Sequence, residues 1–563
     1  MATRDESFDF VIVGSGGGGL LAALAAHEAG LKPVVLEKQG HLGGSTGMSG
    51  GVIWMPDNPL MRAEGVPDSF AEGMTYFDSV VGEPDQGSSL ERREAFLKRG
   101  PEMISLMQRK GVRLVRCEGY SDYYDSRAGG KARGRSIEGV PWDARQLGDW
   151  QHKIIPGMAK GMGMAVKTNE VRKLPMFARS LGAFRTTVRV GARTYLGKWR
   201  HQDVLTNGMS LIGQLTKILV AAGVPLWLNT AVEDLVVEDG RVVGVRAVRD
   251  GAPVLIRGRR GVLLAAGGFE RNPEMRRKYT ADSQPNDGQW TVANAGNTGE
   301  VLAAAIAVGA KTDYMDEAVW LPTPRFEIAG SCLATARNLP RTILVNAHGK
   351  RFVNEGNSYV EVGRAMYATD GVPAYLIFDD VFRRRYPWAR GLPKLSNFGE
   401  VRPGKMPEEW VTKGWVKRAA TIKELAAQIG IDPEALDTTV TSFNGPAARG
   451  EDPEFGRGVS QYNKELGDPG NKPNHGLGPI DTGPFYATEI YPGDVGTMGG
   501  VITDENGRAL DEADEPIPGL YAAGNMAATV MGRTYPGAGA SISNTMVFGY
   551  LAALHAAAQP VAG

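Results

Sequence analysis

Tyrosines stand in three segments where a phenol could take part in a reaction. Tyr535 precedes the run 536–540 (PGAGA), Tyr359 lies in NEGNSYVEV, and Tyr120, Tyr123 and Tyr124 lie in YSDYY. A phenol can donate its proton to a developing oxyanion, and a phenolate can accept a proton. The turn at 532–540 has no Lys and no Walker spacing, so it is not typical of a phosphate-binding loop. Because a lone tyrosine is more often a packing residue, these candidates depend on the elements that would position them.

The N-terminus predicts a dinucleotide-binding unit. An apolar strand over 8–13 (FDFVIV) leads into a glycine turn, an apolar helix follows up to residue 30, and a second strand ends at Glu37. A GxGxxG motif between a strand and a helix, with an acid at the end of the next strand, is typical of pyrophosphate binding at a helix N-terminus. We therefore expect the turn to hold the phosphates and Glu37 to accept hydrogen bonds from the ribose. The turn residues are Gly14, Ser15, Gly16, Gly17 and Gly19.

The stretch that follows this acid favours FAD over NAD. A glycine- and serine-rich loop over 38–54 replaces the helix–strand unit that usually comes next in an NAD domain. The loop resembles the flavin loop of the fumarate reductase/succinate dehydrogenase flavoprotein superfamily, which has GGxS/T at this place. His41 precedes the glycines, so the resemblance implies FAD bound without a covalent link. The loop residues expected to line the flavin are Lys38, Gly44, Ser45, Thr46, Ser49, Gly50 and Gly51.

The same resemblance implies a discontinuous FAD-binding domain of the α/β class, Rossmann-like, with an inserted α+β cap. We expect the FAD-binding domain over 1–289, with an irregular insertion at about 90–205, and its C-terminal part over 489–563. The substrate domain would be 290–488. Asp239-Gly240 predicts a hairpin turn, and 541–557 predicts a helix. By resemblance, further flavin contacts would come from Val232, Ala266, Gly267, Gly524, Asn525, Ala540, Ser541 and Ile542.

The composition argues against several other classes of protein. Equal numbers of acidic and basic residues (63 each) give no indication of nucleic-acid binding. Cys117 and Cys332 are far apart and the seven histidines are scattered, so we expect neither a disulfide framework nor a metal site. No signal peptide and no run of 18 apolar residues is visible, which favours a cytoplasmic protein.

One segment stands apart in charge. Residues 157–200 contain ten Lys or Arg and a single acid, Glu170. A basic surface with apolar side chains could lie on an anionic membrane and admit a lipophilic substrate. The alternative is a solvated loop with a few core contacts.

Two departures argue against a dicarboxylate substrate. The HT-x-GG segment of fumarate reductases corresponds to 496–500 (GTMGG), where Gly496 replaces the histidine. Their C-terminal Arg-Gly-Gly-Asn corresponds to Arg533-Thr534-Tyr535-Pro536-Gly537. Both changes remove groups that bind carboxylates.

The three tyrosine segments resemble those of the 3-ketosteroid Δ1-dehydrogenase family, which has a tyrosine in P/S-D-Y, another in NExxxY and a C-terminal TYPGPGA turn. Here Ala538 replaces the second proline of that turn. The resemblance implies that the Tyr535 hydroxyl and the Gly539 N–H hold the C3 ketone oxygen, as in the tyrosine-containing oxyanion hole of ketosteroid isomerase. Tyr359 would take the C2 proton, helped by Tyr123 or Tyr124, while flavin N5 accepts the C1 hydride. The Tyr123 hydroxyl would lower the pKa of Tyr359. Tyr120 and Trp320 would line an apolar steroid pocket, unless they are ordinary core residues.

Alternatives remain at this level. A 3-ketosteroid Δ4-(5α)-dehydrogenase would use the same ketone grip, a fumarate-reductase-like enzyme would reduce a small enoate, and a flavin-bound protein could act as a redox sensor without turnover. The sequence leaves the preferred steroid, the electron acceptor and the oligomeric state open.

Overall fold

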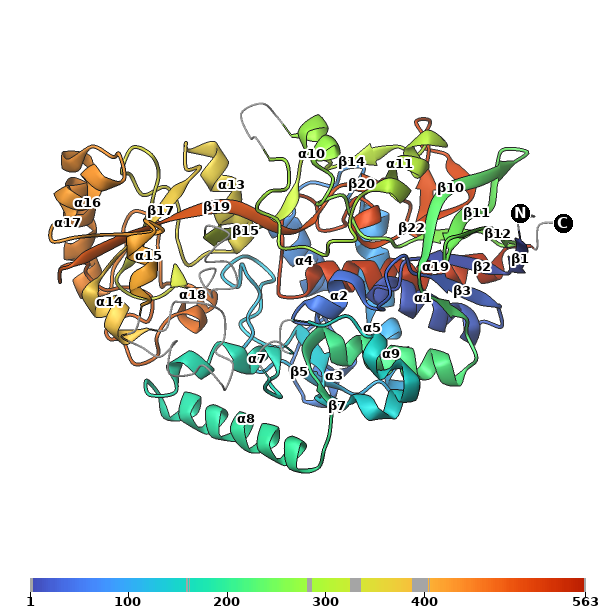
Figure 1. The fold of residues 1–563 in the computed structure, drawn as a ribbon, viewed down its shortest axis with the longest axis horizontal. Coiled ribbons are helices and arrows are strands. Elements are labelled where there is room, and N and C mark those ends of the chain that lie inside the picture. The colour runs from blue at the N-terminus through green and yellow to red at the C-terminus, as the bar shows by residue number, and fades with distance from the viewer. Residues whose placement is uncertain are drawn as a thin grey trace.

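The structure is a computed structural model that describes residues 4–157, 160, 163–280, 286–324, 336–386, 404 and 406–560. It has two parts, which lie at opposite ends of the long axis in Figure 1. We call them the Rossmann-like part, which contains both chain ends, and the cap, which is built from the described residues between 318 and 497. Strand β19 (Phe485–Thr497) runs from the cap toward the Rossmann-like part.

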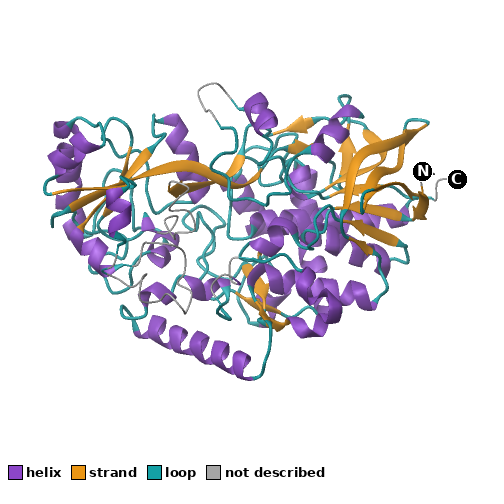
Figure 2. Cartoon of the chain, viewed as in Figure 1, coloured by secondary structure: helices purple, strands orange, loops and turns teal. Residues whose placement is uncertain are grey.

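A mixed sheet forms the centre of the Rossmann-like part (Figure 2). Its order is β21-β22-β13-β2-β3-β9, with β22 to β9 parallel and β21 antiparallel at one edge. The strands are β2 (Phe10–Val13), β3 (Pro33–Leu36), β9 (Leu226–Trp227), β13 (Val262–Leu264), β21 (Arg508–Leu510) and β22 (Pro516–Ala522). The four residues of β2 are fully buried, as expected of a strand covered on both faces.

Helices rich in small and apolar residues pack on this sheet and on one another. Helix α1 (Gly17–Glu28) contacts α19 (Ala540–Ala558) and α9 (Asn207–Ala221), and α19 also contacts α5 (Leu90–Arg109). The predicted turn-to-helix unit and the predicted C-terminal helix are therefore confirmed. A second sheet, β1-β12-β11-β10, adjoins this layer. Its strands are β1 (Arg4–Phe8), β10 (Thr230–Glu238), β11 (Arg241–Arg249) and β12 (Ala252–Gly258), and the predicted hairpin turn at Asp239-Gly240 joins β10 to β11.

Two expectations about irregular segments were wrong. The loop over 38–54 contains a short helix, α2 (Gly44–Met48), which packs on α9. The insertion at 90–205 holds two long helices, α5 and α8 (Leu181–Trp199). Shorter elements of this region are α3 (Pro59–Ala63), α4 (Phe70–Val80), α7 (Thr168–Val171), β4 (Val52–Trp54), β5 (Leu114–Arg116), β6 (Ser136–Gly139), β7 (Trp142–Asp143) and β8 (Val204–Leu205).

The cap is built on an antiparallel sheet of order β15-β19-β17-β16, with β18 pairing on β19. Its strands are β15 (Ala318–Pro324), β16 (Thr342–Val345), β17 (Ala374–Asp379), β18 (Val416–Ala419) and β19. The helices are α13 (Tyr359–Ala368), α14 (Asp380–Arg385), α15 (Glu408–Thr412), α16 (Ile422–Gln428), α17 (Pro433–Arg449) and α18 (Gln461–Leu466). The remaining elements are α10 (Pro273–Tyr279), α11 (Glu300–Ala307), β14 (Thr312–Asp313) and β20 (Gly500–Val501). Helix α11 packs on β10 and β20.

Two absences follow from the part of the chain that is described. None of its helices is long and apolar enough to cross a membrane. Within it, no group of three or more His, Cys, Asp or Glu side chains is placed to hold a metal ion. Cys117 is buried and unpaired, and Cys332 lies outside the described residues.

Candidate active site

A long cavity follows the glycine turn at the carboxyl ends of β2, β3 and β13. Its empty volume is about 880 Å³. Fifteen of the residues predicted to contact the cofactor line it. They are Gly14, Ser15, Gly16, Gly17, Glu37, Lys38, Gly44, Ser45, Thr46, Val232, Ala266, Gly267, Asn525, Ser541 and Ile542. The cavity thus joins segments that are more than 500 residues apart in the chain.

Six other predicted contacts do not line this cavity. Gly50 packs on the Thr168 side chain, and Gly51 packs on the backbone of 207–208. The remaining four are Gly19, Ser49, Gly524 and Ala540. Cavity residues that sequence reasoning missed include Asn294, Asn297 and Thr545. An Asn- and Gly-rich stretch at 293–299 (ANAGNTG) was the available signal for the two asparagines, because such a stretch favours exposed turns with free polar groups.

The cavity suits a dinucleotide with a flavin. A Cβ at Gly16 would enter the cavity, with only Thr46 Oγ1 within 4 Å, at 3.9 Å. Helix α1 has no acid in its first turn, so its positive end is available to a pyrophosphate. Glu37 is buried and accepts hydrogen bonds from Ser15 Oγ (2.5 Å) and the Ser15 N–H (3.2 Å). Burial raises the pKa of Glu37, although its hydrogen bonds to Ser15 oppose that rise.

A second, smaller cavity adjoins the first. It is lined by Val319, Thr497, Met498, Asn525, Thr529, Met531, Tyr535, Ser541 and Asn544. Asn525 and Ser541 line both cavities, and Tyr535 Oη lies 3.1 Å from Ser541 Oγ. The hydroxyl of Tyr535 therefore lies beside a residue that the two cavities share.

The backbone of the PGAG turn is tied down by its carbonyls. The Pro536 carbonyl accepts hydrogen bonds from the Tyr76 hydroxyl (2.7 Å) and the Tyr123 N–H (2.9 Å). Gly539 ends the turn with φ +95 and caps helix α19, and a Cβ there would lie 2.1 Å from the Val52 carbonyl oxygen. Only glycine fits this position. The turn is thus rigid despite Ala538, with N–H groups directed along the positive end of α19.

Four tyrosine rings gather beside this turn. Tyr123 lies against Tyr359, Tyr462 and Tyr535, with ring centroids 5.5, 4.6 and 5.7 Å away, and the Tyr359 and Tyr535 rings are 5.6 Å apart. We call these four residues the tyrosine cluster. The Tyr123 hydroxyl donates to Tyr359 Oη over 3.4 Å. Sequence reasoning had missed Tyr462, which stands in QYNKEL without any neighbouring signal.

Helix α18 fixes the loop that carries Tyr123. The Asp125 carboxylate accepts the backbone N–H groups of Gln461 (2.9 Å) and Tyr462 (3.1 Å) at the start of this helix. At its other end, Glu465 accepts the Ser121 N–H at 3.2 Å. This clamp places Tyr123 against Tyr359. The Tyr124 ring is outside the ring contacts of the cluster, and its backbone N–H donates to the Tyr76 hydroxyl.

Burial decides the protonation of the cluster. Desolvation raises the pKa of Tyr359 well above its ordinary value. The expectation of a lowered pKa for Tyr359 was wrong, because both phenols lie in one buried site and desolvation outweighs the hydrogen bond that Tyr123 donates. Burial also raises the pKa of Tyr462, against the opposing charges of Arg337 and Arg172. Tyr123, Tyr359 and Tyr462 are therefore neutral at pH 7.

The two predicted pocket residues line neither cavity. Tyr120 stacks under Arg172, whose Cζ is 3.9 Å from the ring centroid, and its hydroxyl donates to the Thr168 carbonyl. Burial raises the pKa of Tyr120 to about 12. Trp320 is 2% exposed, and its Nε1–H donates to Glu317 at 3.0 Å. Their place in the structure is that of supporting residues.

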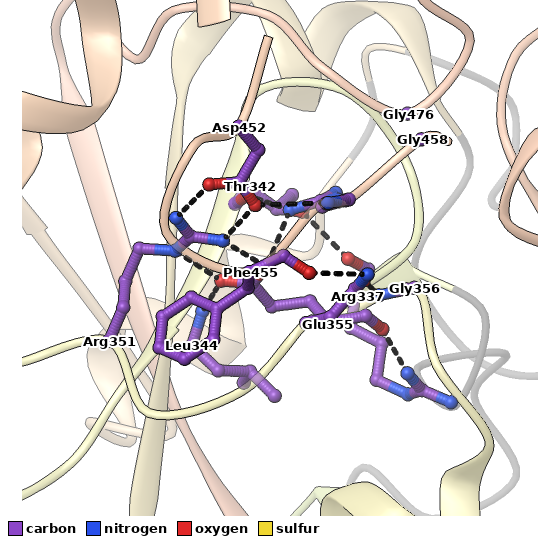
Figure 3. A network of polar contacts seen from close by, with 12 residues as sticks. Arg337, Thr342, Leu344, Arg351, Glu355, Gly356, Asp452, Phe455, Gly458 and Gly476 are labelled. Atoms are coloured by element: carbon purple, nitrogen blue, oxygen red, sulfur yellow. Dashed lines mark hydrogen bonds and ion pairs between the residues drawn. The ribbon is translucent and has the colours of Figure 1, made fainter. Parts of the chain in front are cut away.

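A network of buried ions holds the segment before Tyr359 (Figure 3). Arg351 forms paired hydrogen bonds to Glu355 (2.8 and 2.9 Å) and to Asp452 (2.9 Å each). Arg457 donates to Glu355 at 3.2 Å, and Arg337 donates to the Glu355 carbonyl oxygen. Because Glu355 and Tyr359 belong to the same NExxxY segment, this network sets where α13 begins and where Tyr359 stands.

A Rossmann-like unit, a dinucleotide cavity and an inserted cap with phenols at the junction define a flavin-dependent oxidoreductase. The chain matches the model of the FAD binding domain family over residues 9–542 and belongs to that family. It is 42% identical to the 3-oxosteroid 1-dehydrogenase of Mycolicibacterium smegmatis, covering 99% of this chain and 98% of the relative. It is 33% identical to the 4-oxocyclohex-2-ene-1-carboxylate 5-dehydrogenase of Sinomonas cyclohexanicum, with 97% and 92% covered.

A solved structure agrees with these relatives. The fold matches the crystal structure of 3-ketosteroid Δ1-dehydrogenase from Sterolibacterium denitrificans in complex with 1,4-androstadiene-3,17-dione. The TM-score is 0.89 and the sequence identity 36%, with 98% of this chain and 100% of the other covered. The resemblance drawn from the three tyrosine segments and the predicted fold class are confirmed.

Proposed function

We propose that this protein is an FAD-dependent 3-ketosteroid Δ1-dehydrogenase, which converts a 3-keto-4-ene into a 3-keto-1,4-diene. The observation that carries the proposal is the tyrosine cluster beside a cavity that shares Asn525 and Ser541 with the dinucleotide cavity. In this proposal, the cluster would supply a ketone grip and a base next to the expected hydride acceptor. The 42% identity to a 3-oxosteroid 1-dehydrogenase over nearly the whole chain supports the same conclusion.

The grip on the ketone would come from Tyr535 and Gly539. The Tyr535 hydroxyl faces the smaller cavity, and the backbone at Gly539 is the start of the 19-residue helix α19. Donors fixed by a tied-down turn need no rearrangement as negative charge develops on the ketone oxygen, which is the condition for effective oxyanion stabilisation. The positive end of α19 would favour the same charge. Polarising the ketone makes the neighbouring C2–H more acidic.

The base would be Tyr359, with the Tyr123 hydroxyl donating a hydrogen bond to its oxygen. Bound FAD supplies the hydride acceptor for C1. Because burial raises the pKa of Tyr359, only a small fraction is phenolate at neutral pH, and that fraction is a strong base. The rate should therefore rise with pH through the neutral range.

The charges near the cavity favour a neutral ketone over a small carboxylate. Arg533, beside Tyr535, is held by Asp316 (2.8 and 3.0 Å) and by Glu317 (3.3 Å). Its guanidinium is thus neutralised by two acids and is poorly placed to bind a substrate carboxylate. Gly496 supplies no side chain where fumarate reductases have a histidine.

The test is anaerobic mixing of the FAD-loaded protein with a 3-keto-4-ene steroid, followed by product analysis. We expect bleaching of the flavin absorbance and a 1,4-diene product. Bleaching only by a 5α-saturated steroid, with a 4-ene product, would contradict the Δ1 assignment in favour of a Δ4-(5α)-dehydrogenase. Bleaching by neither steroid, but by 4-oxocyclohex-2-ene-1-carboxylate, would move the substrate to the class of the Sinomonas relative.

We also propose that segment 157–200 lies on an anionic membrane through helix α8. One face of α8 is buried with small residues, whereas Leu181, Phe184, Val188, Tyr195 and Trp199 are 52–73% exposed on the helix. Arg185, Arg189, Lys198 and Arg200 are exposed beside them. Residues 158, 159, 161 and 162 lie outside the described part of the chain. An exposed apolar face flanked by cations matches the chemistry of an anionic lipid surface.

Cosedimentation with vesicles tests this contact. We expect binding to phosphatidylglycerol vesicles and weaker binding to phosphatidylcholine vesicles, with salt weakening the former. The double variant Phe184→Ser/Trp199→Ser should lose most of the binding while flavin reduction stays unchanged. Equal binding of wild type and variant would contradict the proposal.

A further inference from the structure

The carboxyl group of Glu270 is buried next to Asn525, the residue that lines both cavities. Glu270 is 0% exposed and follows the glycine turn of β13 by a few residues. Its Oε1 accepts the Thr497 N–H at 2.8 Å and the Asn525 side-chain N–H at 3.3 Å. Asn525 in turn lines both the dinucleotide cavity and the Tyr535 cavity. Glu270 thus contacts the wall between the two cavities through the side-chain amide of Asn525.

The local backbone leaves room for this contact. A Cβ at Gly496 would lie 2.5 Å from Asn525 Nδ2 and 3.2 Å from Glu270 Oε1. A side chain at 496 would therefore push the amide away from the carboxylate. The contact accordingly depends on the same glycine that replaces the fumarate reductase histidine.

Glu270 also has a charged neighbour, Asp494, which in turn lies beside Arg276. Asp494 is fully buried and pairs with Arg276 at 3.5 Å, and its Oδ1 accepts the Thr291 hydroxyl at 2.6 Å. Burial, followed by the charge of Asp494, raises the pKa of Glu270. In the described residues, Glu270 Oε2 has no hydrogen-bond partner. The carboxyl group is held on one oxygen only, by the two donors that fix it against Asn525.

We propose that Glu270 is a positioning residue that fixes the orientation of the Asn525 amide in the wall of the dinucleotide cavity, and thereby sets the reduction potential of the bound flavin. An amide can rotate about its side-chain torsions, and its two ends present opposite dipoles. Because an N–H of the Asn525 amide is bonded to Glu270, the other polar atoms of that amide are available to groups in the cavity. This inference rests on FAD binding and not on the steroid substrate proposed above.

The test compares the flavin reduction potentials of two variants, one that keeps a hydrogen-bond acceptor at position 270 and one that removes it. Glu270→Gln keeps an oxygen that can accept from Thr497 and Asn525, whereas Glu270→Ala removes the acceptor. We expect Glu270→Ala to change the equilibrium between oxidised and reduced flavin at least tenfold, which is about 30 mV for a two-electron couple. The visible absorption bands should shift with it. Glu270→Gln should stay within about threefold of wild type. Asp379→Asn is the matched control, because it removes a fully buried carboxylate in the cap.

A double-mutant cycle separates positioning from general loss of structure. If Glu270 acts through Asn525, adding Glu270→Ala to Asn525→Ala should produce no further change in the potential. An unchanged potential in Glu270→Ala would overturn the proposal. So would additive effects in the cycle, or a shift in Glu270→Gln as large as in Glu270→Ala. Failure of the steroid assay with a normal potential shift would reject the substrate and leave this inference standing.

Discussion

The tyrosine cluster and the ion network of Figure 3 lie in the same region and are built in opposite ways. In the cluster, neutral phenols meet over a 3.4 Å contact, and burial raises the pKa of each of Tyr123, Tyr359 and Tyr462. In the network, burial also acts on Glu355, but Arg351 and Arg457 outweigh it and hold its pKa below the ordinary value. The phenols proposed for chemistry have no ionic partner among themselves, whereas the supporting carboxylates and guanidinium groups form ion pairs with one another.

This difference has a functional sense. A base must change its protonation during the reaction, so an ionic partner that fixed its charge would remove its use. A support must not change, and paired ions of bidentate geometry hold one arrangement. The two regions are joined through the few residues between Glu355 and Tyr359. If the two regions have separate roles, substitutions in the tyrosine cluster should change the reaction rate, and substitutions in the ion network should change stability.

The largest expected effect is on the cluster. Tyr359→Phe should lower the rate of flavin reduction by about 10² to 10⁴, the usual contribution of a general base, while the steroid still binds. Stopped-flow reduction and equilibrium titration measure the two quantities. Tyr367→Phe is the matched control, because Tyr367 lies on the same helix and packs against Trp320. A Tyr359→Phe rate within about tenfold of wild type would show that Tyr359 is not the base.

The next effect is on the network. Glu355→Gln should lower the free energy of unfolding by about 3 kcal/mol at pH 7, because it leaves two buried guanidinium groups without their shared carboxylate. The folded-state pKa of Glu355 is depressed, so its contribution is present above the unfolded pKa and is lost as pH falls through the folded value. The difference between wild type and variant should therefore shrink in acid.

Urea unfolding of the FAD-loaded protein measures this change. Glu451→Gln is the control, since its ion pair with Arg449 is exposed on both sides and should contribute less than about 1 kcal/mol. Equal stability of Glu355→Gln and wild type would show that the network does not support the cap.

The smallest expected effect comes from Tyr123. Below a raised pKa the phenolate fraction of Tyr359 grows about tenfold per pH unit, so the reduction rate should climb from pH 7 to 9 without a plateau. Tyr123→Phe removes the hydroxyl that donates to Tyr359 and should lower the whole profile about tenfold with the same slope. Tyr124→Phe should leave the profile unchanged. A plateau near pH 7 would contradict neutral phenols, and a larger effect of Tyr124→Phe would exchange the two roles.

Much of the Rossmann-like part could be predicted because its signals are local. The strand, turn and helix at 10–28, the hairpin at Asp239-Gly240 and the helix α19 each follow from neighbouring residues. The error over 38–54 has a tertiary cause. The glycines of α2 favour a loop by propensity, yet packing on α9 makes a helix of them, which is a tertiary effect on a weak preference.

The sequence by itself determined the cofactor class and two of the four tyrosines, Tyr359 and Tyr535, because a phosphate turn and short motifs are formed by consecutive residues. Only the tertiary structure decided what those residues do together. It added Tyr462, chose Tyr123 over Tyr124 for contact with Tyr359, and brought Glu270 against Asn525 across 255 positions. It also reversed the expected pKa of Tyr359, since burial depends on every segment packed around the group and not on its neighbours in the chain.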